Sequence, residues 1–312
     1  MKVAVTAQGE ALDSGMKTFL DCIPCLIRQS LDSVRLVAPD EAVHRQVVRE
    51  VLQATSRMDL DQPPAAMAQT VHRRIRELCR NGDPYRSSKD RFNRLALDLL
   101  PAYRDLVEEA LDPWNAAVRL AIAGNVMDLG VKSGLSESQV RASIDQSLEE
   151  PLDGSTADLA AAVAEARDIL YLTDNAGEIV FDRLLLERMP REKVTVAVKG
   201  FPVINDATLE DAETAGLTRL VRVIDNGSDA PGTILDDCSA SFRRHFADAD
   251  LILSKGQGNY ETLREASSRI YFLLRVKCPV IARDLGCPMG RMVLRPSDAQ
   301  VVDAAEPSRE AL

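Results

Sequence analysis

The chain of 312 residues is long enough for one large domain or two ordinary ones, each with its own buried core. Its formal charge of −10 and its pI near 5.0 argue against a nucleic acid or an anionic membrane as partner, because both require a basic surface. No apolar run approaches the roughly 18 to 20 residues that cross a bilayer, and residues 1–19 contain no signal-peptide core. We therefore expect a soluble, cytoplasmic protein. An enzyme that acts on small molecules fits this charge balance, as do many scaffold proteins, and the sequence leaves open whether the protein forms a homo-oligomer.

The chain begins with an ambiguous segment. Its first residues, "MKVAVTAQG", are typical of a small strand and turn, but a second Met-Lys pair follows at Met16 and Lys17. Either residues 1–16 form a short N-terminal extension, or translation naturally begins at Met16.

The next part of the chain has a helical pattern throughout. Apolar residues recur at spacings of three and four, and proline or glycine interrupts the pattern. The expected helices are residues 17–36, 40–55, 64–79, 90–111 and 113–130. This pattern predicts an all-helical domain over residues 17–150.

After residue 150 the pattern changes to short apolar runs that alternate with helix-like segments. The runs are "ILYL" (169–172), "VTVAV" (194–198), "LVRVI" (220–224), "LILS" (251–254) and "PVIA" (279–282). Such alternation is typical of parallel βαβ units. We therefore predict an open α/β sheet covered by helices over residues 151–312.

Polar loops follow four of the expected strands. They are residues 173–178, 199–208, 225–233 and 255–261, and they contain acids, amides, lysines and glycines. Ligands of open parallel sheets bind outside the carboxyl ends of the strands, so these loops should gather along one edge.

Helix capping is the alternative explanation for the polar residues in these loops. Asn175 would be an N-cap with Glu178 as its capping-box partner, and Asp206 would cap the following helix. Capping explains neither Asp174 beside Asn175 nor Asn205 beside Asp206. We therefore predict a shared site.

The residue types indicate the chemistry of this site. Carboxylate and amide oxygens without histidine or thiolate suit magnesium or manganese better than zinc, and the best candidate ligands are Asp174, Asn175 and Asp206. Lys199 and Lys255 add positive charge, and the N–H groups of the glycine-rich loops form anion-binding concavities. Together these features predict a phosphate site.

Polar residues also interrupt the last apolar helix of the helical part, at Gly124, Asn125 and Asp128. Asn125 and Asp128 would share one helix face at a spacing of three. They are either a buried amide and a helix-end acid, or they hold substrate hydroxyls beneath a helical roof.

Thiols and imidazoles are not expected in the site. Cys22 and Cys25 form a C-x-x-C within an expected helix, and we interpret them as reduced, packed thiols, with a redox or metal role as the alternative. His44, His72 and His245 lie among charged residues and are expected at the surface.

Several motifs together resemble one protein family. In chain order they are "MKTFLDCIPCLIRQ", "AIAGNVMDLG", "LTDNAGEIVFDRLL", "VKGFPVINDATLEDA", "DNGSDAPG" and "ADLILSKGQGNYETL". The family was called domain of unknown function 89 and is now described as damage-control phosphatases, with an acidic-residue-methyltransferase-like metal-binding fold. The resemblance spans Met16 to Leu285 and is greatest for the archaeal and bacterial branch with an early C-x-x-C.

The resemblance implies a helical N-terminal domain on a Rossmann-like α/β/α domain with a mostly parallel open sheet. It also implies metal-dependent hydrolysis of small phosphate esters, such as sugar phosphates, phosphopantetheine-type compounds or other damaged phosphometabolites, with manganese, cobalt, nickel or magnesium. The family's Asp-Asn metal pair matches Asp174 and Asn175, its third acidic ligand matches Asp206, and its phosphate-binding lysine matches Lys255.

The family's Gly-Asn and Asp substrate motif matches Gly124, Asn125 and Asp128. Arginine is usual in the family where this chain has Lys199, and threonine where it has Asn226. Lysine cannot bind phosphate in a bidentate manner, so Lys199 would supply a point charge at this position. The full set of candidates for substrate or phosphate binding is Gly124, Asn125, Asp128, Glu178, Lys199, Gly200, Asn205, Asp225, Gly227, Ser228, Gly256 and Asn259.

The hypothesis from the sequence is that a metal and Lys255 bind phosphoryl oxygens, while either a metal-activated water or Asp174 attacks phosphorus. Two other classes remain open. One is a nucleotide- or S-adenosylmethionine-binding transferase of the carboxyl methyltransferase type, and the other is a non-enzymatic binding protein.

Overall fold

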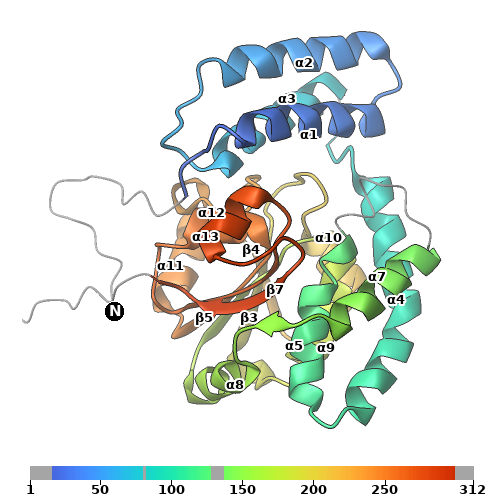
Figure 1. The fold of residues 1–312 in the computed structure, drawn as a ribbon, viewed down its shortest axis with the longest axis vertical. Helices are drawn as coiled ribbons and strands as arrows, with labels where there is room; N and C mark the ends of the chain where they lie inside the picture. The colour runs from blue at the N-terminus through green and yellow to red at the C-terminus, as the bar shows by residue number, and fades with distance from the viewer. Residues whose placement is uncertain (1–15, 80–81, 128–136, 299–312) are drawn as a thin grey trace, which may run out of the picture.

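The computed structural model describes residues 16–79, 82–127 and 137–298. Its first three helices are α1 (Cys22–Val37), α2 (Glu41–Thr55) and α3 (Pro64–Cys79), which form a layer at one end of the molecule (Figure 1, blue). They enclose a small core of their own that includes Val34, Val47 and Ile75. Helix α1 begins five residues later than expected, because Thr18 bonds the backbone of Leu60 and Gln62 instead.

The next helices belong to a larger core that they share with the sheet. They are α4 (Arg86–Glu109), α5 (Pro113–Ala123) and α7 (Glu137–Glu149). Phe92 of α4 and Ile122 of α5 are buried in the same cluster as Phe181 and the strand residue Tyr171. The apolar core therefore runs across residue 150, and the domain boundary placed there stays a prediction.

Within the described residues the sheet has seven strands in the order β1-β7-β6-β5-β2-β3-β4. Neighbouring strands are parallel except β6 and β7, which confirms the mostly parallel α/β class. The strands are β1 (Leu152–Asp153), β2 (Ile169–Leu172), β3 (Val194–Val198), β4 (Arg222–Asp225), β5 (Leu251–Lys255), β6 (Ile270–Arg275) and β7 (Met292–Pro296).

Alternating strand residues contribute to two different cores, one on each face of the sheet. In β2, Ile169 and Tyr171 join the core beneath α5 and α9, whereas Leu170 and Leu172 join the core beneath α11 and α12. This arrangement is a three-layer α/β/α sandwich.

The remaining elements are α8 (Thr156–Glu165), α9 (Glu178–Leu186), α10 (Leu209–Thr214), α11 (Ala240–Asp248), α12 (Gln257–Leu263), α13 (Pro279–Leu285), and the 3₁₀ turns η1 (Arg191–Lys193), η2 (Leu217–Arg219) and η3 (Leu235–Asp237).

One strand prediction is wrong. The run "PVIA" lies in helix α13, because Pro279 occupies the first turn and the Cys278 sulfur accepts a hydrogen bond from the Ile281 N–H. The strands that follow β5 are instead Ile270–Arg275 and Met292–Pro296, which the sequence analysis did not identify.

Within the described ranges no helix combines the length and apolar character needed to span a membrane.

Candidate metal and phosphate site

The loops that follow β2, β3, β4 and β5 are joined to one another by hydrogen bonds. The N–H of Ala207 donates to the Asp174 carbonyl at 2.8 Å, and Asn175 and Asp206 form an isolated antiparallel bridge. The N–H of Gly200 donates to the Ser228 carbonyl at 3.0 Å, and the Asn259 amide donates to the Thr173 carbonyl at 3.1 Å. The structure therefore brings the polar loops together at the carboxyl edge of the sheet.

The three predicted metal ligands lie in the two loops that this bridge connects. Asn175 and Asp206 are buried, and Asp174 is half-buried. The Asp174 Oδ2 accepts hydrogen bonds from the Nδ2 atoms of Asn125 at 2.9 Å and Asn175 at 2.8 Å. Because the Asn175 nitrogen is engaged with carboxylates, its Oδ1 is the side-chain atom that can coordinate a cation.

Gly256 leaves space beside the Asp174 carboxylate. A Cβ at this position would lie 2.0 Å from the Asp174 Oδ2, and the residue has φ +80°, a conformation that favours glycine. Two carboxylates and one amide oxygen fit a hard divalent cation. Among the described residues no three His, Cys, Asp or Glu side chains form a group that could hold a metal ion.

The helix-capping alternative is excluded by the observed helix starts. The N-cap of α9 is Gly177, not Asn175, and the Asn175 amide instead donates to Glu178 at 2.9 Å. Helix α10 begins after Thr208, whose capping box uses Asp211. Neither Asn175 nor Asp206 therefore caps a helix.

Glu178 connects the amides of the site to Lys255. Its Oε2 accepts hydrogen bonds from Asn125 at 2.7 Å and from Asn175 at 2.9 Å, and its Oε1 lies 2.7 Å from the Lys255 Nζ. The same Nζ contacts Asp182 at 2.5 Å and donates to the Ala121 carbonyl at 2.9 Å. Because its three N–H groups have these acceptors, direct contact of Lys255 with a phosphate would require one of them to be replaced.

Two buried carboxylates share the single charge of Lys255, and this arrangement shifts their ionisation. Burial raises the pKa of the Asp182 carboxyl to about 6, with the charge of Lys255 opposing the shift and that of Glu178 adding to it. Burial lowers the pKa of Lys255, but the charges of Asp182 and Glu178 more than compensate and raise it. Lys255 is therefore a cation held by the fold.

The other lysine, Lys199, lies beside Asp206. Its Nζ is 3.4 Å from the Asp206 Oδ2 and donates to the Gly232 carbonyl, and its side chain is buried. The adjacent Gly200 packs against the backbone of Gly227, where a Cβ would approach within 2.5 Å. This close contact places the turns after β3 and β4 side by side.

Asn226 supports those turns. Its Oδ1 accepts hydrogen bonds from the N–H groups of Gly200 at 3.0 Å and Ser228 at 2.9 Å. The Ser228 hydroxyl donates to Asp237 at 2.6 Å, and the exposed Asp225 accepts from the Gly227 N–H at 3.0 Å. In this structure Ser228 and Asp225 stabilise the turn itself.

The remaining predicted residues have different positions. Asn259 is buried and links β5 to the other loops, and its Oδ1 accepts a hydrogen bond from Thr233 at 2.7 Å. The Asn205 Nδ2 and the Asn125 Oδ1 are buried atoms without a hydrogen-bond partner among the described residues. Gly124 ends α5 close to Phe181. The predicted residue Asp128 lies outside the described residues.

Sequence reasoning missed two groups that support the site. Asp182 was detectable, because with Glu178 it places two acids four residues apart in the apolar run "EIVFDRLLL". Asp229 had no local signal, since its partners Arg73 and Arg76 lie in α3.

The histidine prediction is wrong for His72. This residue is buried and lies 3.1 Å from the Tyr85 hydroxyl. Cys22 and Cys25 are both reduced thiols. Cys22 is half-buried, which raises its pKa, while Cys25 is exposed rather than packed.

The fold and site define a Rossmann-like α/β/α protein with a polar site at the carboxyl ends of its central strands. The sequence profile of the family described as "Damage-control phosphatase ARMT1-like domain" matches residues 18–293. The chain therefore belongs to this family, and membership supports a phosphatase role.

Named relatives agree with the assignment. A damage-control phosphatase of Archaeoglobus fulgidus is 36% identical over 280 residues, which are 88% of this chain and 97% of that protein. A damage-control phosphatase of Pyrococcus horikoshii is 34% identical over 286 residues, covering 89% and 97% of the two chains. A crystal structure of a DUF89 family protein from Pyrococcus horikoshii superposes with a TM-score of 0.81 at 33% identity, covering 90% of this chain and 99% of that chain.

Proposed function

We propose that this protein is a metal-dependent phosphomonoesterase that hydrolyses small phosphate esters, with sugar phosphates and phosphopantetheine-type compounds as the substrate classes to test. The observation that carries the proposal is the bridge between Asn175 and Asp206, which joins the Asp174-Asn175 pair to an acid that lies 3.4 Å from the Lys199 Nζ. Asp174, Asn175 and Asp206 would hold the metal, with manganese, nickel, cobalt and magnesium as candidates. A bound divalent cation would supply positive charge to the phosphoryl group and lower the pKa of a coordinated water.

The chain's own residues orient the acids and compensate their charge. Asn125 and Asn175 hold the Asp174 carboxylate in one orientation through its Oδ2. Lys199 places a positive charge next to Asp206 and is the lysine closest to the proposed metal ligands by direct contact. The contacts of Lys255 favour a positioning role through Glu178 over direct phosphate binding, which stays a prediction from the sequence.

Two routes of hydrolysis fit this arrangement. In the first, Asp174 attacks phosphorus, an O–P bond forms as the ester P–O bond breaks, and water then releases phosphate from the acyl phosphate. In the second, water attacks directly and Asp174 only binds. Rapid quenching with a ³²P-labelled substrate separates the routes, because only the first leaves label on the protein.

The test of the function is a panel of sugar phosphates and phosphopantetheine compounds, assayed with each of the four metals and with a chelator. We expect phosphate release with at least one metal, none with chelator, and a loss of about a hundredfold or more in Asp174→Asn. Asp32→Asn is the matched control, because Asp32 lies in α1 and pairs with Arg28 at the surface.

Two outcomes would reject the proposal. Full activity of Asp174→Asn would exclude both routes, and an inactive wild type with every substrate and metal would leave no support for a phosphatase. Binding of S-adenosylmethionine by the metal-free protein, measured by equilibrium dialysis, would favour the transferase alternative.

A further inference from the structure

A hollow of about 630 Å³ lies at the amino ends of β2, β3 and β4, the opposite edge of the sheet from the candidate metal site. Its floor contains the buried residues Val194, Thr195 and Val221. The segment before β2, the turns η1 and η2, the start of β4 and helix α11 form its walls. The basic side chains that line it are Arg167, Arg191, Lys193, Arg219, Arg222 and His245.

This lining is positively charged although the whole chain carries a formal charge of −10. Five arginine or lysine residues face only two acids, Asp168 and Glu192. Arg167 pairs with Asp250 at 3.4 Å, and Arg222 contacts the Nε2 of His245, at 3.4 Å, instead of an acid.

Four cationic side chains of the lining have no acidic partner among the described residues. In the part of the chain that the structure describes, no carboxylate lies within 4.0 Å of the cationic groups of four lining residues. They are Arg191, Lys193, Arg219 and Arg222. The hollow therefore concentrates uncompensated positive charge.

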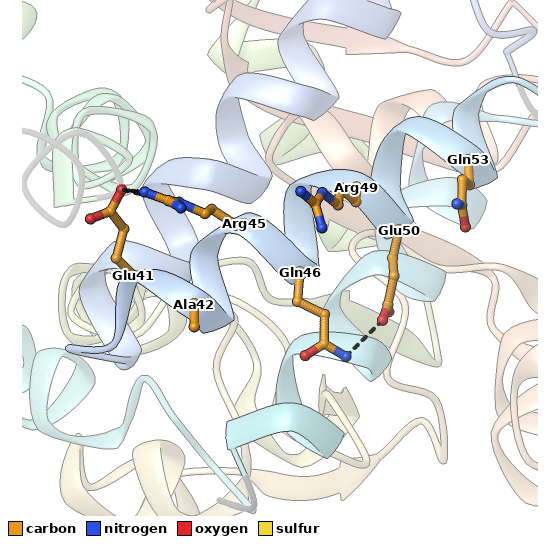
Figure 2. Close-up of a pocket in the computed structure, with 7 residues that line it drawn as sticks. All are labelled: Glu41, Ala42, Arg45, Gln46, Arg49, Glu50 and Gln53. Atoms are coloured by element: carbon orange, nitrogen blue, oxygen red, sulfur yellow. Dashed lines mark hydrogen bonds and ion pairs between the residues drawn. The ribbon is translucent and has the colours of Figure 1, made fainter.

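A second hollow of similar volume, which is also lined by arginines, does not have this excess of basic over acidic residues. It measures about 770 Å³ and lies along α2, where Figure 2 shows all its lining residues on one helix. Arg45 pairs with Glu41 at 2.9 Å, and Gln46 bonds Glu50 at 3.0 Å. Its lining contains equal numbers of arginines and glutamates, although Glu50 also pairs with Arg74 of α3, so this surface is an ordinary solvated helix face.

We propose that the hollow at the amino ends of β2, β3 and β4 binds a compact polyanion with two or more phosphoryl or carboxyl groups. Its volume lies within the range of small-molecule sites, and guanidinium groups match such oxyanions with paired N–H donors. Among the described lining residues none is Phe, Tyr or Trp, and the imidazole of His245 contacts Arg222, so the lining is dominated by charged groups and not by aromatic rings. The ligand is therefore recognised by its charge.

This site is separate from the candidate catalytic site. Strands β2 and β3 contain four and five residues and connect the hollow to the loops of Asp174 and Lys199. At about 3.3 Å per residue, the two sites are roughly 15 Å apart. The inference is independent of the proposed phosphatase activity.

Hydrogen exchange of the full-length protein tests the location of the site. Pyrophosphate and citrate are the two probes, used separately at about 0.15 M ionic strength with chelator present, which prevents a contribution from bound metal. We expect slower amide exchange in residues 191–195 and 218–222 with at least one probe, and the two probes distinguish phosphoryl from carboxyl ligands. Protection confined to residues 173–178 and 255–261, or no protection with either probe, would overturn the proposal.

Calorimetric titration of paired variants tests the residues. Arg191→Gln with Arg222→Gln should weaken binding of the protecting probe about tenfold or more, because two charge-assisted contacts are lost. The control, Arg45→Gln with Arg49→Gln, changes the net charge equally on the α2 face and should alter the affinity by less than about twofold. An equal loss of affinity in both double variants, or no loss in either, would contradict a specific site.

Discussion

At the scale of single residues, Gly256 explains why the Asp174 carboxylate has room in the site. We expect Gly256→Ala to reduce phosphatase activity by about a hundredfold, because the new Cβ would displace the Asp174 Oδ2 from its position 2.0 Å away. Unfolding in urea should also show a loss of about 1–3 kcal/mol from the positive φ.

Gly286→Ala is the control for this substitution. Gly286 also has a positive φ, of +66°, but a Cβ there meets no atom of the described residues within 4 Å. It should lose about 1 kcal/mol of stability and keep its activity. Equal activity losses in both variants would show that backbone strain, not the Asp174 contact, is responsible.

Asp182 leads to a prediction about pH. Its pKa is raised to about 6 in the folded protein from an ordinary 3.8, so the native state binds more protons than the unfolded state between these values. The contribution of Asp182 to the free energy of unfolding is therefore greatest below pH 4 and is lost as pH rises through about 6.

Asp182→Asn should remove this contribution. Urea unfolding at several values between pH 4.5 and 7.5 should show the wild type losing stability relative to the variant as pH rises through this interval. Asp32→Asn, an exposed change of the same chemistry, should parallel the wild type. A constant difference between wild type and Asp182→Asn across the series would contradict the raised pKa.

At the scale of elements, Asp229 attaches α3 to the loop that follows β4. Its carboxylate accepts hydrogen bonds from Arg73, Arg76 and Gln69. Burial alone would raise the pKa of Asp229, but the hydrogen bonds from Arg73 and Gln69 and the arginine charges outweigh it and lower it. The side chains of Asp229 and Arg76 are 8% and 17% exposed, so this contact is largely shielded from water, whereas Arg73 is 48% exposed.

Asp229→Asn should therefore lower the free energy of unfolding by about 1.5–3 kcal/mol, the usual contribution of hydrogen bonds to a charged group. The comparison variant is Asp61→Asn, whose pair with Lys17 is about two-thirds exposed and should contribute less than about 1 kcal/mol. Urea denaturation measures both, and losses of equal size would show that Asp229 does not anchor α3.

At the scale of the whole molecule, a cation bound between two loops should stabilise the folded chain. If the metal binds only the native state and its free concentration is about one hundred times the dissociation constant, linkage predicts a gain of about 2.7 kcal/mol in the free energy of unfolding. In a chain of 312 residues that gain corresponds to a rise of about 4 °C in the thermal midpoint. Calorimetry with manganese and with chelator measures the difference.

Asp206→Asn should abolish the metal-dependent rise, because it removes one of the two carboxylates from the proposed site. Asp225→Asn, an exposed residue of the neighbouring loop, should retain it. A rise of the same size in Asp206→Asn would place the bound cation elsewhere.

Much of the fold follows from local patterns of the sequence. The apolar periodicity of residues 40–55 and 64–79 identified α2 and α3, and the runs at 169–172 and 194–198 identified β2 and β3. The run at 279–282 was misassigned, because four apolar residues do not distinguish a strand from a buried helix turn. Proline at the first helical position, Pro279, is the signal that favours a helix over a strand for this run.

The sequence by itself determined the sheet class, the convergence of the polar loops and the pairing of Asp174 with Asn175, because parallel strands present their carboxyl ends at one edge. Only the tertiary structure decided that Lys255 is enclosed by Glu178 and Asp182, and that Asp229 anchors α3. It also assembled the basic hollow, whose arginines come from separate segments between residues 167 and 222. These contacts join residues far apart in the chain, and their geometry depends on helix packing that no local pattern encodes.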